Sequence, residues 1–336
     1  MEREPYLSIV IAVRNDNYGG DFNRRLHTAL GWNTKLLEKY QINTEIILVN
    51  WNPIPEKPDI LSLYSAPKGR QHVYYRVIDV PYEHHKKYNN PIVRKNFPLY
   101  EFIAKNVGIQ RAKGSFVLCT NADVLFSEIL IGNIAKQTLE NDKVYRSLRC
   151  DFIFRSPIEK ESDIQENVTA FFLESGVIPS TGKESFKKRL RKAQLRNRQK
   201  ILFYKIYLPF RMFYNYYSSQ LFLMKHLFNA SGDFLLMHRV NWLKGNHYPE
   251  DTYIATHTDS LHLLRCLANN LDEVILDGYV YHQEHQRRFD FSEKNKSMDL
   301  MFQRLLNSVH QYIVNNKPEG ISQEWGISEN LKETIL

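Results

Sequence analysis

Short apolar runs alternate with stretches of helical periodicity along the first 120 residues. Residues 7–13 (LSIVIAV), 45–49 and 115–119 are rich in β-branched or bulky apolar side chains and predict strands buried on both faces, and residues 73–80 predict another. Between these runs, apolar residues from Phe22 to Tyr40 recur near helical spacing, and residues 100–112 predict a second helix. This alternation predicts an α/β fold, a doubly wound, mostly parallel sheet that binds ligands at the carboxyl ends of its strands.

The alternation stops near residue 156 and resumes at residue 232. Residues 232–237 and 274–276 predict further strands, residues 257–267 predict a helix, and residues 297–314 predict a closing helix. The chain shows no internal repeat and no low-complexity linker. We therefore expect one domain over residues 1–290 that carries an insertion over residues 156–230, followed by a C-terminal helix and tail over residues 291–336.

The net charge of +8 is concentrated in one segment, so it indicates an anionic partner for that segment and not a general property of the chain. Residues 183–211 hold eleven Lys or Arg and a single acid, so this basic segment carries +10 and the rest of the chain carries −2. Aromatic residues crowd its end and continue from Phe203 to Tyr217. Cations beside interfacial aromatics favour attachment to an anionic membrane surface. Nucleic acid would also be attracted, and a solvated helix packed through its aromatic half is a third interpretation.

Other features narrow the class of protein. The three cysteines, Cys119, Cys150 and Cys266, lie far apart and have no metal-finger spacing. No signal-peptide pattern opens the sequence, and no run approaches the ~20 apolar residues of a spanning helix. We expect a cytoplasmic protein, attached peripherally to the inner membrane face if the basic segment binds lipid. The absence of G-x-G-x-x-G after the first predicted strand argues against an NAD dehydrogenase.

The most specific stretch is residues 104–123, AKNVGIQRAKGSFVLCTNAD, which predicts a helix, a glycine turn, a buried strand and an acid at the end of the strand. It resembles the family 2-like GT-A glycosyltransferases, in which a helix with N-x-G leads through A-x-G into a strand that ends in a D-x-D-type motif. Asn121-Ala122-Asp123 stands at that motif. The resemblance implies a GT-A (Rossmann-like) fold and an enzyme that transfers a sugar from a nucleotide-sugar donor, a UDP-sugar in the first place, to a carbohydrate or lipid-linked glycan.

The resemblance also assigns roles to residues. It implies that Asp123 holds Mg²⁺ or Mn²⁺, which neutralises the departing diphosphate, and that His282 or His285 completes the coordination. The residues expected to bind the donor are Val13, Arg14, Asn15, Asn50, Lys105, Asn106, Asn121 and Asp123. Asn121 and Asn50 depart from the family pattern, since each places an amide where family members commonly show an acid.

A carboxylate base is expected on the acceptor side. An inverting transferase needs one to take the proton of the acceptor hydroxyl, and the candidates are Glu250, Asp251 and Asp259. Asp259 ranks first because the run from Asp259 to Arg265 (DSLHLLR) matches the pattern of an acid, an apolar helix and an arginine.

Each assignment has a structural alternative. Asp123 and Asp259 are also suited to capping the helices that follow them, and Asn15 and Asn50 are common turn residues. Among functions, a nucleotidyltransferase would show a glycine-rich, lysine-containing loop after the first strand, which residues 14–20 (RNDNYGG) match poorly. A nucleic-acid-binding protein with a non-catalytic Rossmann-like domain would leave residues 106–123 and the late acids unexplained.

Overall fold

The computed structural model describes residues 4–64, 67–88, 97–174, 231–245, 247–250, 257–285, 303–313 and 325–336. The first half alternates as predicted, through β1 (Leu7–Val13), α1 (Phe22–Lys39), β2 (Thr44–Trp51), α2 (Ile60–Leu63), β3 (Val73–Val80), α3 (Tyr82–Lys87), α4 (Glu101–Arg111) and β4 (Phe116–Thr120). Four elements follow, namely β5 (Val124–Phe126), α5 (Glu128–Ala135), β6 (Lys143–Phe152) and α6 (Glu161–Glu174). The last part contains β7 (Phe234–His238), α9 (Arg239–Leu243), α10 (Thr258–Ala268), β8 (Asp272–Gln283) and β9 (Lys332–Ile335), and residues 303–313 are also helical.

The described strands form one nine-stranded sheet in the order β5-β8-β6-β7-β4-β1-β2-β3-β9. Its centre, β4-β1-β2-β3, is parallel, as the buried apolar runs predict. The antiparallel strand β7 lies between β4 and β6, and β9 closes the other end as the antiparallel neighbour of β3. The fold is therefore of the α/β class, and its mixed sheet has a parallel core.

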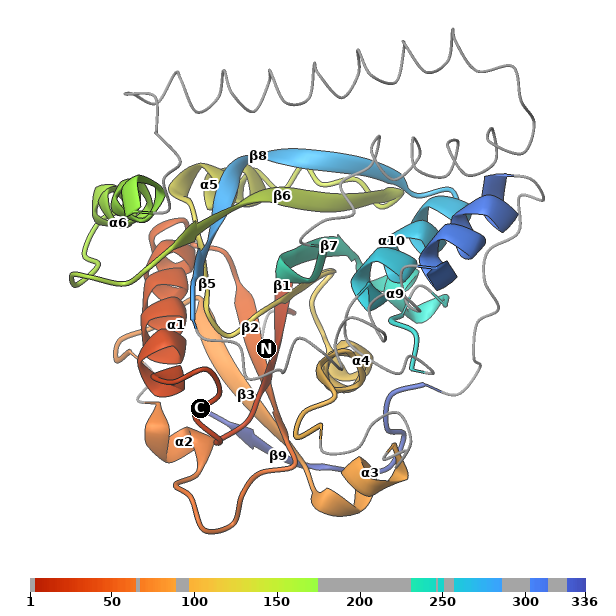
Figure 1. The fold of residues 1–336 in the computed structure, drawn as a ribbon, viewed down its shortest axis with the longest axis horizontal. Helices are drawn as coiled ribbons and strands as arrows, with labels where there is room; N and C mark the ends of the chain where they lie inside the picture. Colours follow the sequence, from red (N-terminus) through yellow and green to blue (C-terminus); the bar gives the residue numbers. More distant parts are fainter. Residues whose placement is uncertain are drawn as a thin grey trace, which may run out of the picture.

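Helices cover both faces of this sheet. In Figure 1, α1 lies to the left of β1, β2 and β3, and α4, α9 and α10 lie to the right. Side chains of β1 alternate between two cores, because Ile9 and Ile11 pack on the α1 side while Val10 and Ala12 pack on the α4 side. Burial on both faces explains why the sequence of β1 is a continuous apolar run rather than an alternating one.

The glycines of residues 104–123 serve close packing. A Cβ atom on Gly108 would lie 2.5 Å from Cγ1 of Val10, and one on Gly114 would lie 2.6 Å from the backbone N of Ser8. Both distances are shorter than side chains tolerate, so only glycine lets α4 and the following turn lie against β1. The N-x-G and A-x-G pattern thus fixes how α4 and the turn before β4 lie against β1.

The C-terminal tail adds an element that the sequence does not predict. Strand β9 pairs with β3, and the buried guanidinium of Arg76 joins them, with Nε 2.6 Å from Oε1 of Glu333. Nη1 of Arg76 also donates to the buried carboxylate of Glu45 at 2.5 Å. An ion-paired arginine on β3 therefore holds a strand whose sequence, KETI, carries little apolar signal.

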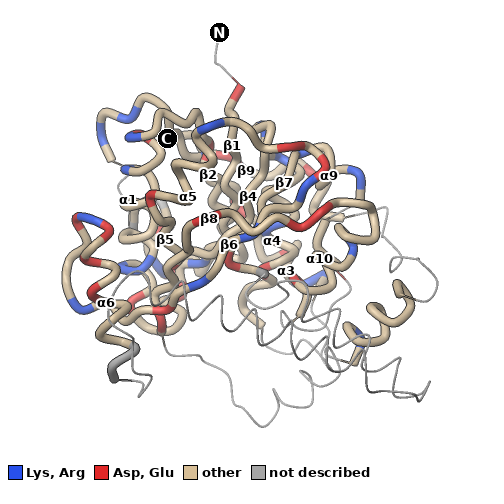
Figure 2. The backbone as a smooth tube through the Cα atoms, turned by 90° about the horizontal axis from the view of Figure 1, so that it is seen from above, with Lys and Arg blue, Asp and Glu red and all other residues tan. Residues whose placement is uncertain are grey.

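Charged residues of both signs are interspersed along the described chain (Figure 2). The predicted insertion over residues 156–230 is described up to residue 174, where α6 ends, so the basic segment 183–211 lies outside the described residues. No described helix combines the length and apolarity that a bilayer-spanning segment needs.

Candidate functional site

Asp123 lies in the turn between β4 and β5, on the carboxyl side of the parallel core. The next helix, α5, is capped by Ser127, whose Oγ accepts a hydrogen bond from the backbone N of Leu130 at 3.2 Å. The carboxylate of Asp123 is therefore not the cap of this helix, which was the structural alternative for this acid.

Asp123, His282 and His285, here called the triad, come together at this turn. Oδ2 of Asp123 lies 3.7 Å from Nε2 of His282 and 3.2 Å from Nε2 of His285. The three potential ligand atoms lie within 4.8 Å of one another. Strand pairing sets this geometry, because β8 lies antiparallel to β5 and the backbone N of Gln283 donates to the carbonyl of Asp123 at 3.0 Å.

The triad carboxylate is ionised in a mostly buried setting. Burial by itself would raise the pKa of Asp123, but the hydrogen bond from His285 and the charges of His282 and Arg25 outweigh it and hold the pKa below its ordinary value. Arg25 is 2% exposed and its Nε lies 3.6 Å from Oδ2 of Asp123. Its Nη groups donate to the carbonyls of Tyr18 and Gly20, so the loop after β1 is tied to the same site.

A second set of charged residues, Arg149, Asp151 and Asp233, surrounds His282, and we call it the arginine network. Nη1 of Arg149 lies 2.8 Å from Oδ2 of Asp233, and its Nη2 lies 2.6 Å from Oδ1 of Asp151. Oδ1 of Asp151 is 3.0 Å from Nδ1 of His282, because these residues are register partners in the parallel pair β6 and β8. The hydrogen bond to Asp151 and the charge of Asp123 outweigh burial and raise the pKa of His282.

Asn121 links the arginine network to α4. Its Oδ1 accepts from Nζ of the fully buried Lys105 at 2.7 Å, and its Nδ2 donates to Oδ1 of Asp233 at 3.0 Å. An aspartate at position 121 would place two carboxylates in contact, whereas the amide can donate to one side and accept from the other. This arrangement gives a physical reason for the departure from D-x-D.

Asp259 reaches the same region through Gly232. Oδ2 of Asp259 accepts from the backbone N of Gly232 at 2.7 Å, while the carbonyl of Gly232 accepts from Nζ of Lys105 at 3.2 Å. Asp259 lies in the first turn of α10, where Oδ1 accepts from the backbone N of Ser260 at 2.9 Å. Burial raises its pKa to about 6, although the charge of Arg146 acts in the opposite direction.

The other predicted residues on the acceptor side take part in different contacts. Oε1 of Glu250 accepts from Nδ2 of Asn106 at 2.8 Å and from the backbone N of Gly326 at 2.6 Å. Asn106 also exchanges two hydrogen bonds with the backbone of Tyr248. These contacts join α4, residues 247–250 and the C-terminal tail, and no contact between Glu250 and the triad is seen in the described part of the chain. Asp251 lies outside the described residues.

The residues predicted at the ends of β1 and β2 lie side by side, since Val13 pairs with Asn50. Arg14 donates to Asp16 and to the carbonyl of Asn52. The amide of Asn15 contacts the backbone of Ile54 and Pro58, which is the role expected of a turn residue. Asn50 donates to Asp79, while its buried Oδ1 has no hydrogen-bond partner among the described residues.

Four residues of this region were not predicted, namely Arg25, Arg149, Asp151 and Asp233. Arg149 and Asp151 flank Cys150 on β6, so their side chains leave the same face of the strand. A pair of opposite charges at alternate positions was the available signal, but the polar composition of β6 also hid the strand itself. Asp233 stands in the motif SGDF before β7, where only its neighbours suggested a role.

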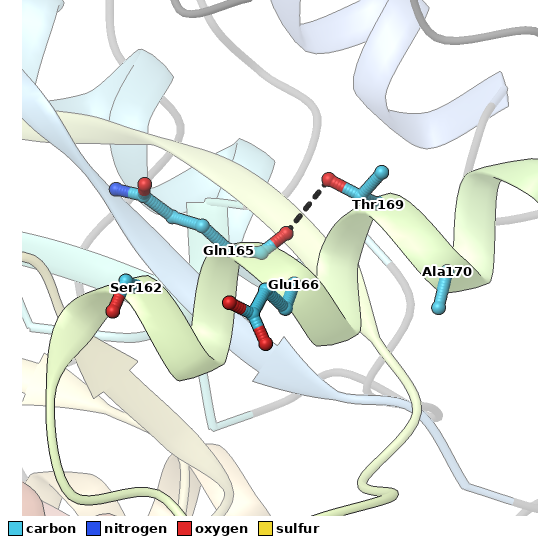
Figure 3. Close-up of a pocket in the computed structure, with 5 residues that line it drawn as sticks. All are labelled: Ser162, Gln165, Glu166, Thr169 and Ala170. Atoms are coloured by element: carbon cyan, nitrogen blue, oxygen red, sulfur yellow. Dashed lines mark hydrogen bonds between the residues drawn. The ribbon is translucent and has the colours of Figure 1, made fainter.

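A pocket away from the triad runs along α6 (Figure 3). It is lined by Ser162, Gln165, Glu166, Thr169 and Ala170, all from this one helix, and Oγ1 of Thr169 donates to the carbonyl of Gln165 at 2.8 Å. None of the predicted site residues lines it, and we assign it no role.

The triad offers one carboxylate oxygen and two imidazole nitrogens to a cation. Mg²⁺ prefers oxygen ligands in near-ideal octahedral geometry, whereas imidazole nitrogen suits transition metals. Mn²⁺ accepts both kinds of ligand, so the donor set fits Mn²⁺ better than Mg²⁺. Three protein ligands would leave coordination positions for oxygen atoms of a second molecule.

Comparisons with known proteins identify the fold. No family model matches the chain, and no curated protein matches it significantly. Among solved structures, GalNAc-T7 with UDP, GalNAc and Mn²⁺ aligns with a TM-score of 0.51 at 13% identity, over 92% of this chain and 48% of that chain. S. aureus TarS 1–349 aligns with a TM-score of 0.44 at 11% identity, over 92% of this chain and 72% of that chain. The chain has the GT-A fold predicted from residues 104–123.

Proposed function

We propose that the protein is a glycosyltransferase that moves a hexose from a UDP-sugar to a carbohydrate or lipid-linked glycan, with the help of a divalent cation. The observation that carries this proposal is the meeting of Asp123, His282 and His285 at the carboxyl side of the parallel core of a GT-A fold. In such sheets, ligands bind beyond the carboxyl ends of the strands. The similar GalNAc-T7 structure holds UDP and Mn²⁺, which supports the choice of donor and cation.

The residues divide the work in the following way. Asp123, His282 and His285 would hold the cation, which when bound supplies positive charge to the departing diphosphate. The guanidinium of Arg25, whose Nε lies 3.6 Å from Oδ2 of Asp123, adds a fixed positive charge beside the triad. Lys105 and Asn121 hold Gly232 and Asp233 in place between the triad and α10.

Asp259 is the proposed base. Its carboxylate takes the proton of the acceptor hydroxyl while the hydroxyl oxygen attacks the anomeric carbon, and the bond from that carbon to the diphosphate oxygen breaks. A single displacement of this kind inverts the anomeric configuration. The pKa of about 6 supports the role, because the group is mostly ionised at neutral pH and still accepts a proton well.

A donor screen with one variant tests the proposal. UDP-, GDP- and dTDP-sugars are incubated with the protein and Mn²⁺, and slow hydrolysis of the donor is scored without an acceptor. Asp123→Ala should lower turnover of the UDP-sugar on the order of a thousandfold, since charge stabilisation by a bound cation is worth several kcal/mol. Asp142→Ala is the matched control, because that acid is 66% exposed and pairs only with Lys143 among the described residues. Near-normal turnover by Asp123→Ala at saturating donor and Mn²⁺ would show that the metal assignment is wrong.

A further inference from the structure

Nδ1 of His282 faces two groups of opposite character. Oδ1 of Asp151, a hydrogen-bond acceptor, lies 3.0 Å away, and Nη2 of Arg149, a donor, lies 2.8 Å away. A neutral imidazole carries one proton, on Nδ1 or on Nε2, and the position of that proton decides which ring nitrogen can bind a cation. The two neighbours of Nδ1 therefore bear on whether His282 is ready to act as a ligand.

The surroundings of Nε2 favour a proton on Nδ1. There it makes a hydrogen bond to Asp151 at 3.0 Å, whereas on Nε2 it would face Oδ2 of Asp123 at 3.7 Å, beyond hydrogen-bonding distance. Arg149 has acceptors other than Nδ1, because its Nε donates to Oδ1 of Asp151 at 2.8 Å and its Nη1 lies 2.8 Å from Oδ2 of Asp233. With the proton on Nδ1, the lone pair of Nε2 points toward Asp123.

His285 differs from His282 in this respect. Its Nε2 lies 3.2 Å from Oδ2 of Asp123, within the range of a hydrogen bond to that carboxylate. In this arrangement Nε2 of His285 carries the proton, and that proton must leave before the nitrogen can bind a cation. The two histidines, whose roles the sequence could not distinguish, thus differ in which ring nitrogen carries the proton.

We propose that Asp151, held by Arg149, is a positioning residue that keeps the proton of His282 on Nδ1 and so presents Nε2 to the cation. This inference rests on the metal site of the proposed function. His282 is the prepared ligand of the triad, whereas in His285 the proton must move from Nε2 to Nδ1 before Nε2 can bind the cation. Carboxylates that orient a metal-binding histidine in this way typically change metal affinity by 10–100-fold when they are removed.

The test reads the tautomer and the affinity directly. The full chain is labelled with ¹⁵N-histidine, freed of metal with a chelator and studied by NMR at alkaline pH, where the ring is neutral. His282 should show a protonated Nδ1 in the wild type, and Asp151→Ala should move the proton to Nε2, because Arg149 then remains as the donor facing Nδ1. Titration with MnCl₂ by calorimetry should show affinity about 10–100-fold weaker in Asp151→Ala.

Glu284→Ala is the matched control. It removes a carboxylate from the same surroundings, and Glu284 forms a second group of possible metal ligands with Asp151 and His282. Oε2 of Glu284 is 3.7 Å from Nδ1 of His282 and makes no hydrogen bond to it. An equal loss of Mn²⁺ affinity in both variants would therefore show that Asp151 is a ligand and not a positioning residue. Glu284→Ala should keep the wild-type tautomer and weaken Mn²⁺ binding less than Asp151→Ala does. The proposal is overturned if the wild type carries the proton on Nε2, binds no Mn²⁺, or loses no affinity in Asp151→Ala. Neither measurement uses a sugar donor, so failure of sugar transfer would leave this result standing.

Discussion

The carboxylate of Asp259 combines burial with two hydrogen bonds from backbone N–H groups, those of Gly232 and Ser260. Hydrogen bonds to the ionised form lower a pKa, so the shift to about 6 means that burial outweighs them. Glu250, by contrast, accepts from Asn106 and Gly326 and ties together three segments of the chain. The carboxylates of Asp259 and Glu250 therefore serve different purposes.

A pH dependence follows from the raised pKa of Asp259. The base must be ionised to take a proton, and below pH 6 a growing share of the carboxylate is protonated. With Mn²⁺ kept saturating, so that protonation of the metal-binding histidines does not limit the rate, sugar transfer should be level above pH 7 and fall about tenfold per pH unit below pH 6. The measurement is kcat/KM of transfer to an acceptor over this range, with donor binding followed separately.

Two substitutions check the assignment. Asp259→Asn keeps the shape of the side chain but cannot accept the proton, so transfer should be lost far more than donor binding. Glu250→Gln should leave the fall in rate below pH 6 unchanged. It should mainly lower the melting temperature, because Glu250 accepts a hydrogen bond from the backbone of Gly326. If Asp259→Asn stays active and its transfer rate still falls below pH 6, another group is the base.

At the scale of elements, the glycine of N-x-G makes a packing prediction. Gly108→Ala would place a methyl group 2.5 Å from Cγ1 of Val10 and 3.1 Å from Cγ2 of Val49, in the contact between α4 and the sheet. Overpacking of this kind costs about 1–3 kcal/mol of the free energy of unfolding. Chemical denaturation should show this loss, and activity per folded molecule should fall as well because α4 carries Lys105.

Gly31→Ala in α1 is the opposite case. A Cβ atom there meets nothing within 4 Å, so the helix should gain up to about 1 kcal/mol from the better helix propensity of alanine. The two variants make the same chemical change within helices that flank the same sheet. Equal effects on unfolding would contradict the packing explanation of the motif.

The elements differ in how well the sequence predicts them, for a physical reason. Strands β1, β2 and β4 are buried on both faces and are mostly apolar, and β3 is largely buried, so all four were found with their approximate bounds. Strand β6 (KVYRSLRCDF) holds charged residues that pair within the site, and β9 (KETI) is a mostly exposed edge strand held through Arg76. Both depend on contacts with distant residues, which periodicity cannot reveal.

The residues of the candidate site also differ in how well the sequence predicts them. Asp123 was predicted from a motif local in sequence, and His282 and His285 from their resemblance to late histidines of the family, so the triad could be assembled in advance. Asp151 and Arg149 acquire a role only because β6 pairs with β8, which places Asp151 beside His282. The register of strands more than 100 residues apart is a tertiary property, and no local pattern encoded it.

At the scale of the whole molecule, charge is divided unevenly. The basic segment 183–211 carries +10 and the remainder −2, so attraction to an anionic partner belongs to that segment and not to the chain at large. Each basic residue near an anionic membrane contributes on the order of 1 kcal/mol, and several together favour reversible docking. We expect the protein to float with vesicles that contain phosphatidylglycerol at low salt, and to be released as salt screens the charges.

A pair of variants with equal net charge separates local from global attraction. Replacing Lys187, Lys188, Arg189, Arg191 and Lys192 with Gln should release the protein from these vesicles. The control replaces five exposed lysines of the described fold with Gln, namely Lys57, Lys68, Lys86, Lys136 and Lys244. Both variants lose five positive charges, so a global effect would weaken docking equally, whereas docking through the basic segment leaves the control bound.

Transfer to a water-soluble acceptor should survive in both, because the triad and Asp259 are untouched. If the wild type ignores anionic vesicles at low salt, or if the control is released as readily as the first variant, the segment does not dock the protein on membranes.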